Sequence, residues 1–210
     1  MTSSKVASCV RTHFGIGLLT LAALLFTAGC DLPSEAREGT VDANAAANTA
    51  AGSAALRGQD GQSANRQLAA LRRATAAFHD VEKAEAAGWN VQFPPECLTH
   101  AELGGMGVHR FNPGLVDDTV IVTQPELIVY EPQANGRLRL VAVEYIIPFS
   151  IRPRDAAPPT LFGRPFMQNE TYDVWALHAW AWKHNPRGTF QNFNPKVTCA
   201  YADIVRTFPE

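Results

Sequence analysis

The sequence lacks the short motifs that identify most well-known catalytic and nucleotide-binding folds. It has no Gly-x-Ser-x-Gly elbow, no Walker loop, no dinucleotide fingerprint, no His-Glu-x-x-His and no Cys-x-x-Cys. It also has no basic stripe, since 18 Lys and Arg against 20 Asp and Glu are spread along the chain. Nucleic acid is therefore not an expected partner.

Long hydrophobic runs are also missing. The longest run, from residue 14 to residue 28, is about 15 residues, whereas a membrane span needs about 20. Lys5 and Arg11 precede it and no acidic residue does, which is the layout of a secretory signal peptide. We therefore expect residues 1–29 to be removed on export, which moves the net charge from −2 to −4.

The end of this run, Leu24-Leu25-Phe26-Thr27-Ala28-Gly29-Cys30, resembles the lipobox of bacterial lipoproteins. The resemblance implies that Cys30 becomes the diacylated, palmitate-bearing first residue of the mature chain. Thr27 stands where such motifs usually have Leu, and the alternative is ordinary cleavage after Gly29 that leaves Cys30 a free thiol. We expect a lipid anchor in the bacterial cell membrane, with the protein facing the periplasm or exterior. In a Gram-negative host, Asp31 favours the inner membrane.

Large apolar residues are scarce between residues 31 and 65, where Ala, Gly, Asn, Ser and Thr dominate. Such a composition cannot bury enough apolar surface to fold alone. We interpret residues 30–65 as the lipidated Cys30 followed by a flexible tether, whose reach as a coil is about 30–35 Å. Residues 66–210 then form a single globular domain.

Cysteine is rare, with only 4 in the chain. Cys9 leaves with the signal peptide and Cys30 carries lipid, so Cys97 and Cys199 are left as a pair. Outside the cytoplasm we expect them to form a disulfide, although two separately buried thiols remain the alternative.

The domain begins with a clear helical pattern. Leu68, Leu71, Thr75, Phe78 and Glu82 follow a 3-4 spacing, and Gly88 ends the run, which predicts about five to six turns of amphipathic helix. Strands are predicted at residues 119–123, 126–131, 137–147 and 171–183, with a turn at Asn135-Gly136 and a proline-rich crossing over 148–167. We expect an α+β fold: one long helix on a three- to five-stranded antiparallel sheet with long Pro-rich loops, cystatin-like by analogy.

Three residues are the best candidates for chemistry. Alternation places Glu144 in an aliphatic strand face and His178 between tryptophans. His109 lies on a glycine-rich loop, whose glycines should let it approach other backbone closely. A carboxylate in an apolar stripe needs a partner. If His109, Glu144 and His178 converge, they suit a divalent metal such as zinc with an open position, or a catalytic general acid/base pair.

Simpler interpretations of these residues stay open. A lone His on an apolar strand is more often an ordinary core residue than a ligand, and the tryptophans are more often core than a stacking platform. Glu144 has four alternative basic partners, namely Arg137, Arg139, Arg152 and Lys183.

Several short segments together resemble an uncharacterised family of secreted bacterial proteins. These are Gly104-Gly105-Met106-Gly107-Val108-His109, Tyr130-Glu131-Pro132, Val143-Glu144-Tyr145, Leu161-Phe162-Gly163, Trp180-Ala181-Trp182-Lys183 and Asn194-Pro195. The resemblance covers most of residues 70–200 and implies domain limits, but no activity.

Three functions are compatible with this sequence. The first is a tethered module that binds a small ligand or an envelope partner protein in an aromatic-lined cleft beside the proline-rich crossing. The second is a metal-dependent or acid/base enzyme that uses the His/Glu/His constellation. The third is a structural envelope protein.

Overall fold

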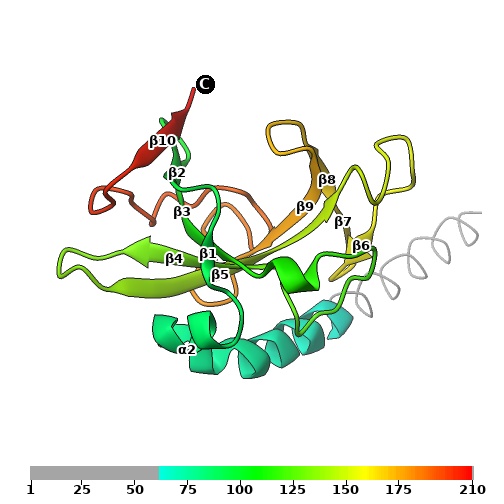
Figure 1. Cartoon of the computed structure of the whole chain (residues 1–210), viewed down its shortest axis with the longest axis horizontal. Coiled ribbons are helices and arrows are strands. Elements are labelled where there is room, and N and C mark those ends of the chain that lie inside the picture. The colour runs from blue at the N-terminus through cyan, green and yellow to red at the C-terminus, as the bar shows by residue number, and fades with distance from the viewer. Residues whose placement is uncertain (1–61, 210) are drawn as a thin grey trace, which may run out of the picture. The chain divides into compact units, whose positions relative to one another are not determined.

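A large curled sheet dominates residues 62–209, the part of the chain that the computed structural model describes. Seven strands follow the order β10-β2-β3-β4-β5-β9-β8, and β1 pairs with β3. Neighbouring strands are antiparallel, apart from β10, which runs parallel to β2. Figure 1 shows both ends of the sheet turned up to one side, with the helices beneath the other. The strands of this sheet are β1 Val91–Gln92, β2 Cys97–His100, β3 Gly104–Phe111, β4 Leu127–Pro132, β5 Leu138–Pro148, β8 Met167–Asn169, β9 Val174–Ala179 and β10 Val205–Phe208.

The predicted α+β fold is wrong in both of its layers. The sheet is larger than three to five strands and is mixed, so a cystatin-like roll does not describe it. The predicted strand at residues 119–123 is absent, and the predicted strand at 171–183 shortens to β9. The hairpin is confirmed: β4 and β5 pair around Asn135-Gly136, where Gly136 has a φ of 76°.

The single long helix is also wrong, because the helical segment is broken into three pieces. Residues 62–75 are helical, a 3-10 turn (η1) covers Ala76–His79, and a short helix, α2, covers Val81–Ala86. Trp182 Nε1 donates to Thr75 Oγ1, which itself donates to Leu71 O, and Tyr130 Oη donates to Phe78 O. These bonds lie where the α-helix ends, and the local bond from Thr75 to Leu71 O is of the kind that bends helices.

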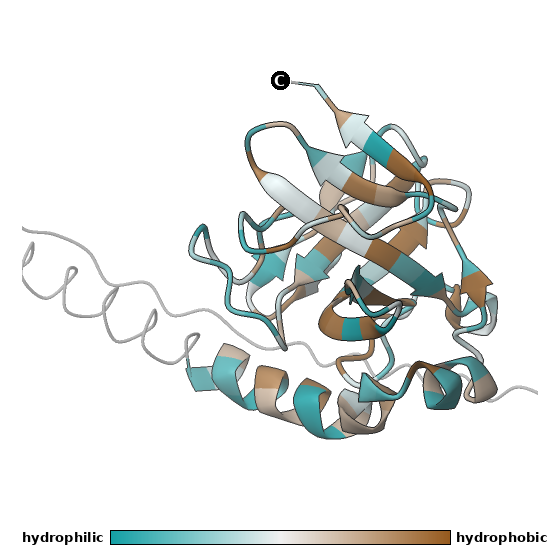
Figure 2. Ribbon diagram, turned by 90° about the vertical axis from the view of Figure 1, so that its left-hand side faces the viewer, coloured by the Kyte–Doolittle hydropathy of each residue, from teal (hydrophilic) through white to brown (hydrophobic). Residues whose placement is uncertain are grey.

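The sheet has two buried faces. The helix-side face carries Val143, Tyr145, Trp175 and Leu177, which pack with Leu71 of the helix. Ile128, Tyr130 and Leu140 continue that face toward α2. The opposite, concave face carries Leu127, Val129, Ala142, Ile146 and Val174. Figure 2 shows hydrophobic colour concentrated along the strands and alternating with hydrophilic colour along the helix.

The proline-rich crossing is mostly exposed, but a few of its residues help to close the core. It contains a small hairpin of β6 (Thr160–Leu161) and β7 (Arg164–Pro165). Phe162 and Phe166 of this hairpin are buried against the helix-side face together with Trp175. The tryptophans considered from sequence are core residues, as the simpler interpretation held: Trp175 and Trp180 are buried, and Trp182 packs partly buried against the same core.

The predicted disulfide is present. Cys97 and Cys199 are bonded, with Cα atoms 5.8 Å apart and 102 residues between them in sequence. In the chain-entropy model, a loop of this length stabilises the fold by about 4.7 kcal/mol. No helix among residues 62–209 is long and apolar enough to cross a membrane. The predicted signal peptide, Cys30, Asp31 and the predicted tether as far as residue 61 lie outside the described residues.

Candidate functional site

Three strands bring His109, Glu144 and His178 together on the concave face. His109 lies on β3, Glu144 on β5 and His178 on β9, and Glu144 and His178 are direct cross-strand partners. One ligand atom from each side chain lies within 4.8 Å of the other two. His109 Nε2 is 3.4 Å from Glu144 Oε2. The convergence considered from sequence is therefore present.

The curl of the sheet makes this meeting possible. β4 separates β3 from β5, and in a flat sheet two strands that flank a third lie about 9–10 Å apart. On the concave side the inward-pointing side chains tilt toward each other. The residues of β4 between them, Leu127 and Val129, are aliphatic and leave the three polar groups to face one another.

The cluster is buried and lacks hydrogen-bond partners. His109 and His178 are each 1% exposed, and the Glu144 side chain is 12% exposed. Among the described residues, none of the four imidazole nitrogens has a hydrogen-bond partner. A neutral imidazole always carries one N–H donor, and leaving a buried donor unpaired costs about 1–3 kcal/mol. A group that residues 62–209 do not supply would satisfy these atoms.

Burial also sets the charge of the cluster. It lowers the pKa of His109 to about 4 and, with the charge of His109, holds that of His178 well below its usual value. Burial raises the pKa of Glu144 to about 7. At neutral pH both imidazoles are therefore uncharged, as metal ligation requires. A cation beside Glu144 would favour the ionised form of its carboxylate.

The donor set suits a divalent transition-metal ion. Two imidazoles and one carboxylate are the ligands of several catalytic zinc and iron centres. Ligands about 2.0–2.1 Å from a tetrahedral zinc lie about 3.3 Å apart, close to the His109–Glu144 separation. Three protein ligands leave at least one coordination position open.

The cluster lies at the wall of a cavity. A cavity of about 350 Å³ is lined by His109 and Glu144 together with the concave-face residues Leu127, Ile146 and Val174. Residues of β10 and β8, at opposite ends of the sheet, contribute Phe208 and Met167 to the same cavity. The volume is at the lower end of the range for small-molecule sites.

The glycines before His109 lie in a strand, not in a loop as predicted. Gly105 N donates to Val197 O and Asn194 N donates to Gly105 O, so residues 194–197 pack directly on β3. A Cβ on Gly105 would lie 2.8 Å from Val197 O. The expected close backbone approach is therefore confirmed, and it covers the concave face next to the cluster.

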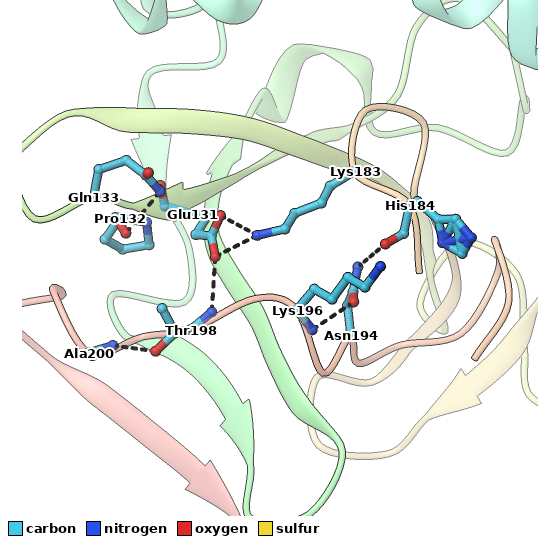
Figure 3. Close-up of polar contacts among 9 residues, drawn as sticks. All are labelled: Glu131, Pro132, Gln133, Lys183, His184, Asn194, Lys196, Thr198 and Ala200. Atoms are coloured by element: carbon cyan, nitrogen blue, oxygen red, sulfur yellow. Dashed lines mark hydrogen bonds and ion pairs between the residues drawn. The ribbon is translucent and has the colours of Figure 1, made fainter. Parts of the chain in front are cut away.

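The alternative basic partners of Glu144 are occupied or lie elsewhere. Arg152 bonds Asp118, and Lys183 Nζ donates to both carboxylate oxygens of Glu131, at 2.8 and 2.7 Å. Figure 3 shows this second ion pair, together with the bond from Thr198 N to Glu131. Glu131 thus ties the C-terminal segment to β4, and Glu144 is left facing the histidines.

Sequence analysis missed two polar residues near the cluster. Glu126 is 3% exposed, and its Oε2 accepts a hydrogen bond from Ile146 N. Tyr172 lines the cavity, and its hydroxyl is buried with no hydrogen-bond partner among the described residues. A carboxylate at the start of a strand and a tyrosine in a turn gave no pattern that distinguishes them from surface residues.

The geometry defines a buried histidine–carboxylate centre that opens into an apolar cavity. Comparisons with known protein families, curated proteins and solved structures found no match to this chain.

Proposed function

We propose that this protein is a metal-dependent enzyme that acts on a small molecule. His109, Glu144 and His178 hold one divalent transition-metal ion, and the cavity presents the substrate to the open side of that ion. The observation that carries the proposal is the convergence of four unpartnered imidazole nitrogens with a buried carboxylate at a cavity wall. Structural metal sites are closed by a fourth protein ligand, whereas catalytic sites keep an open position.

The chemistry of such a centre follows from its charge. A bound divalent ion acts as a Lewis acid on a ligand oxygen and lowers the pKa of a bound water toward neutrality. The residues of this chain supply the orientation of the ion and a largely apolar surrounding, which strengthens electrostatic effects. A metal-free general acid/base pair of His109 and Glu144 is the second candidate, supported by their 3.4 Å contact and by the raised pKa of Glu144.

Metal analysis of the full chain, purified without a histidine tag, tests the proposal. We expect about one equivalent of a divalent transition metal per chain, and its loss in His109→Ala, His178→Ala and Glu144→Gln. His184→Ala is the matched control, because His184 is exposed and outside the cluster. Metal content that is unchanged in all three cluster variants would contradict a metal centre there and leave the acid/base pair.

We further propose that the enzyme works outside the cytoplasm, anchored through a lipid on Cys30. The support is the sequence pattern of residues 1–30 and the Cys97–Cys199 disulfide, a bond typical of oxidising compartments. Mass spectrometry of the N-terminal peptide should find a diacylated Cys30, and Cys30→Ser should release the protein from the membrane fraction. An unmodified Cys30 at the mature N-terminus would show ordinary signal cleavage instead.

A further inference from the structure

The wall of the cavity selects for an apolar ligand body. Most of its lining is aliphatic or aromatic, and the amides Gln168 and Asn169 belong to the edge strand β8. No lysine or arginine lines the cavity among the described residues. The apolar lining residues include Leu98, Leu127, Ile146, Val174, Phe193 and Phe208. A ligand that fills this space therefore buries mostly carbon.

The charges around the cavity indicate the charge of the ligand's head group. A divalent ion with one glutamate and two neutral histidines keeps a net charge of +1 facing the cavity. The other acidic residue of the lining, Glu170, shares Arg154 with Asp173, so this group of three side chains keeps one negative charge. Arg206 adds positive charge near the cavity, since its guanidinium carbon lies 5.9 Å from the ring centre of Tyr172 and 5.2 Å from that of Phe208. A single negative charge on the ligand completes this arrangement.

Tyr172 supplies a polar contact from the wall of the cavity. Its buried hydroxyl has no hydrogen-bond partner among residues 62–209 by distance and angle, although the Arg206 guanidinium lies beside the ring. Burial raises the pKa of Tyr172, so the hydroxyl keeps its proton and acts as a donor. A ligand oxygen in the cavity would give this donor the acceptor that the protein lacks.

We propose that the ligand of this cavity is a small apolar monoanion, a carboxylate on a hydrocarbon or aryl body. One carboxylate oxygen binds the metal, the head group accepts a hydrogen bond from Tyr172 Oη, and the body lies against the apolar wall. The proposal rests on the metal centre proposed above and specifies its substrate class.

The test uses the full chain loaded with cobalt(II), whose visible spectrum reports changes at the metal. The cobalt-loaded protein is titrated with butanoate, hexanoate and octanoate. The controls are the alkylamine and the alcohol with the same number of carbon atoms as each carboxylate. We expect the carboxylates to perturb the spectrum, with affinity rising up to about fourfold per methylene until the cavity is full. Amines that bind as tightly as carboxylates, or carboxylate affinity that does not depend on chain length, would overturn the proposal.

Tyr172→Phe tests the head-group contact, because the Tyr172 hydroxyl has no hydrogen-bond partner among the described residues. It should lower carboxylate affinity about tenfold and leave cobalt content unchanged. Tyr201→Phe is the control, because Tyr201 is 57% exposed and does not line the cavity. Unchanged affinity in Tyr172→Phe would remove Tyr172 from the site. A chain that takes up no cobalt overturns the metal centre itself, whereas one that binds cobalt but no carboxylate overturns only the ligand class.

Discussion

At the scale of single residues, Glu126 shows how a buried acid makes stability depend on pH. Burial raises its pKa from 4.5 to about 8 in the folded protein. The folded state therefore holds a proton up to about pH 8 that the unfolded state releases above pH 4.5. Stability from this group is fully present below pH 4.5 and is lost as pH rises toward 8.

Glu126→Gln should remove this loss and keep the bond from Ile146 N, because the amide oxygen is also an acceptor. Between pH 5 and pH 8, the free energy of unfolding of the wild type should fall relative to the variant by up to about 1.4 kcal/mol per pH unit. Urea unfolding at several pH values measures both curves, and the groups that they share cancel in the difference. Parallel curves would show that Glu126 is ionised in the folded protein.

The candidate site could be predicted at this scale because its members break an apolar pattern. A lone Glu144 in an aliphatic strand and a His178 among tryptophans both require partners, whatever the topology. Tyr172 and Glu126 could not be found in this way. Their importance depends on the absence of a partner for the Tyr172 hydroxyl and on the depth of Glu126, which only the folded chain shows.

At the scale of elements, the ion pair of Glu131 and Lys183 attaches the C-terminal segment to β4. The Glu131 side chain is 6% exposed and that of Lys183 is 16% exposed. Glu131 also accepts a hydrogen bond from Thr198 N. The same carboxylate therefore holds both ends of the loop between Lys183 and Thr198, which covers the concave face.

Glu131→Gln should lower the free energy of unfolding by about 3–5 kcal/mol, because it leaves the ammonium of Lys183 without its anionic partner. The double variant Glu131→Met with Lys183→Met should be more stable than Glu131→Gln, since it leaves no unpaired charge. Glu170→Gln is the matched control: its pair with Arg154 is about half exposed, so the cost should be under about 1 kcal/mol. Equal losses in the Glu131 and Glu170 single variants would contradict this account.

Sequence patterns predicted strands that pair with a neighbour along the chain. They missed strands whose partners are distant in sequence. The hairpin of β4 and β5 has its turn signal and both strands in one segment. In contrast, β10 pairs in parallel with β2 about 100 residues away, and each has only four residues. The break in the helix coincides with hydrogen bonds from Trp182 and Tyr130, which are remote in sequence. A register shift between Val129 and Tyr130 also places Leu140 on the helix side, away from Glu144, although simple alternation puts both on one face.

At the scale of the whole described domain, the curl of the sheet links fold to function. It brings β3, β5 and β9 close enough for three side chains to meet, and it brings β10 and β8 to opposite sides of one cavity. The disulfide and the Glu131 pair hold the C-terminal segment beside this concave face. The fold thus supplies a supported centre with one open, mostly apolar side.

The most direct measurement is a crystal structure of the full chain with diffraction data collected on both sides of the absorption edge of the copurified metal. The account predicts one anomalous peak within about 2.0–2.2 Å of a nitrogen of His109, a nitrogen of His178 and an oxygen of Glu144, with its remaining side toward the cavity. No peak among these three side chains, in crystals whose protein carries stoichiometric metal, would contradict it.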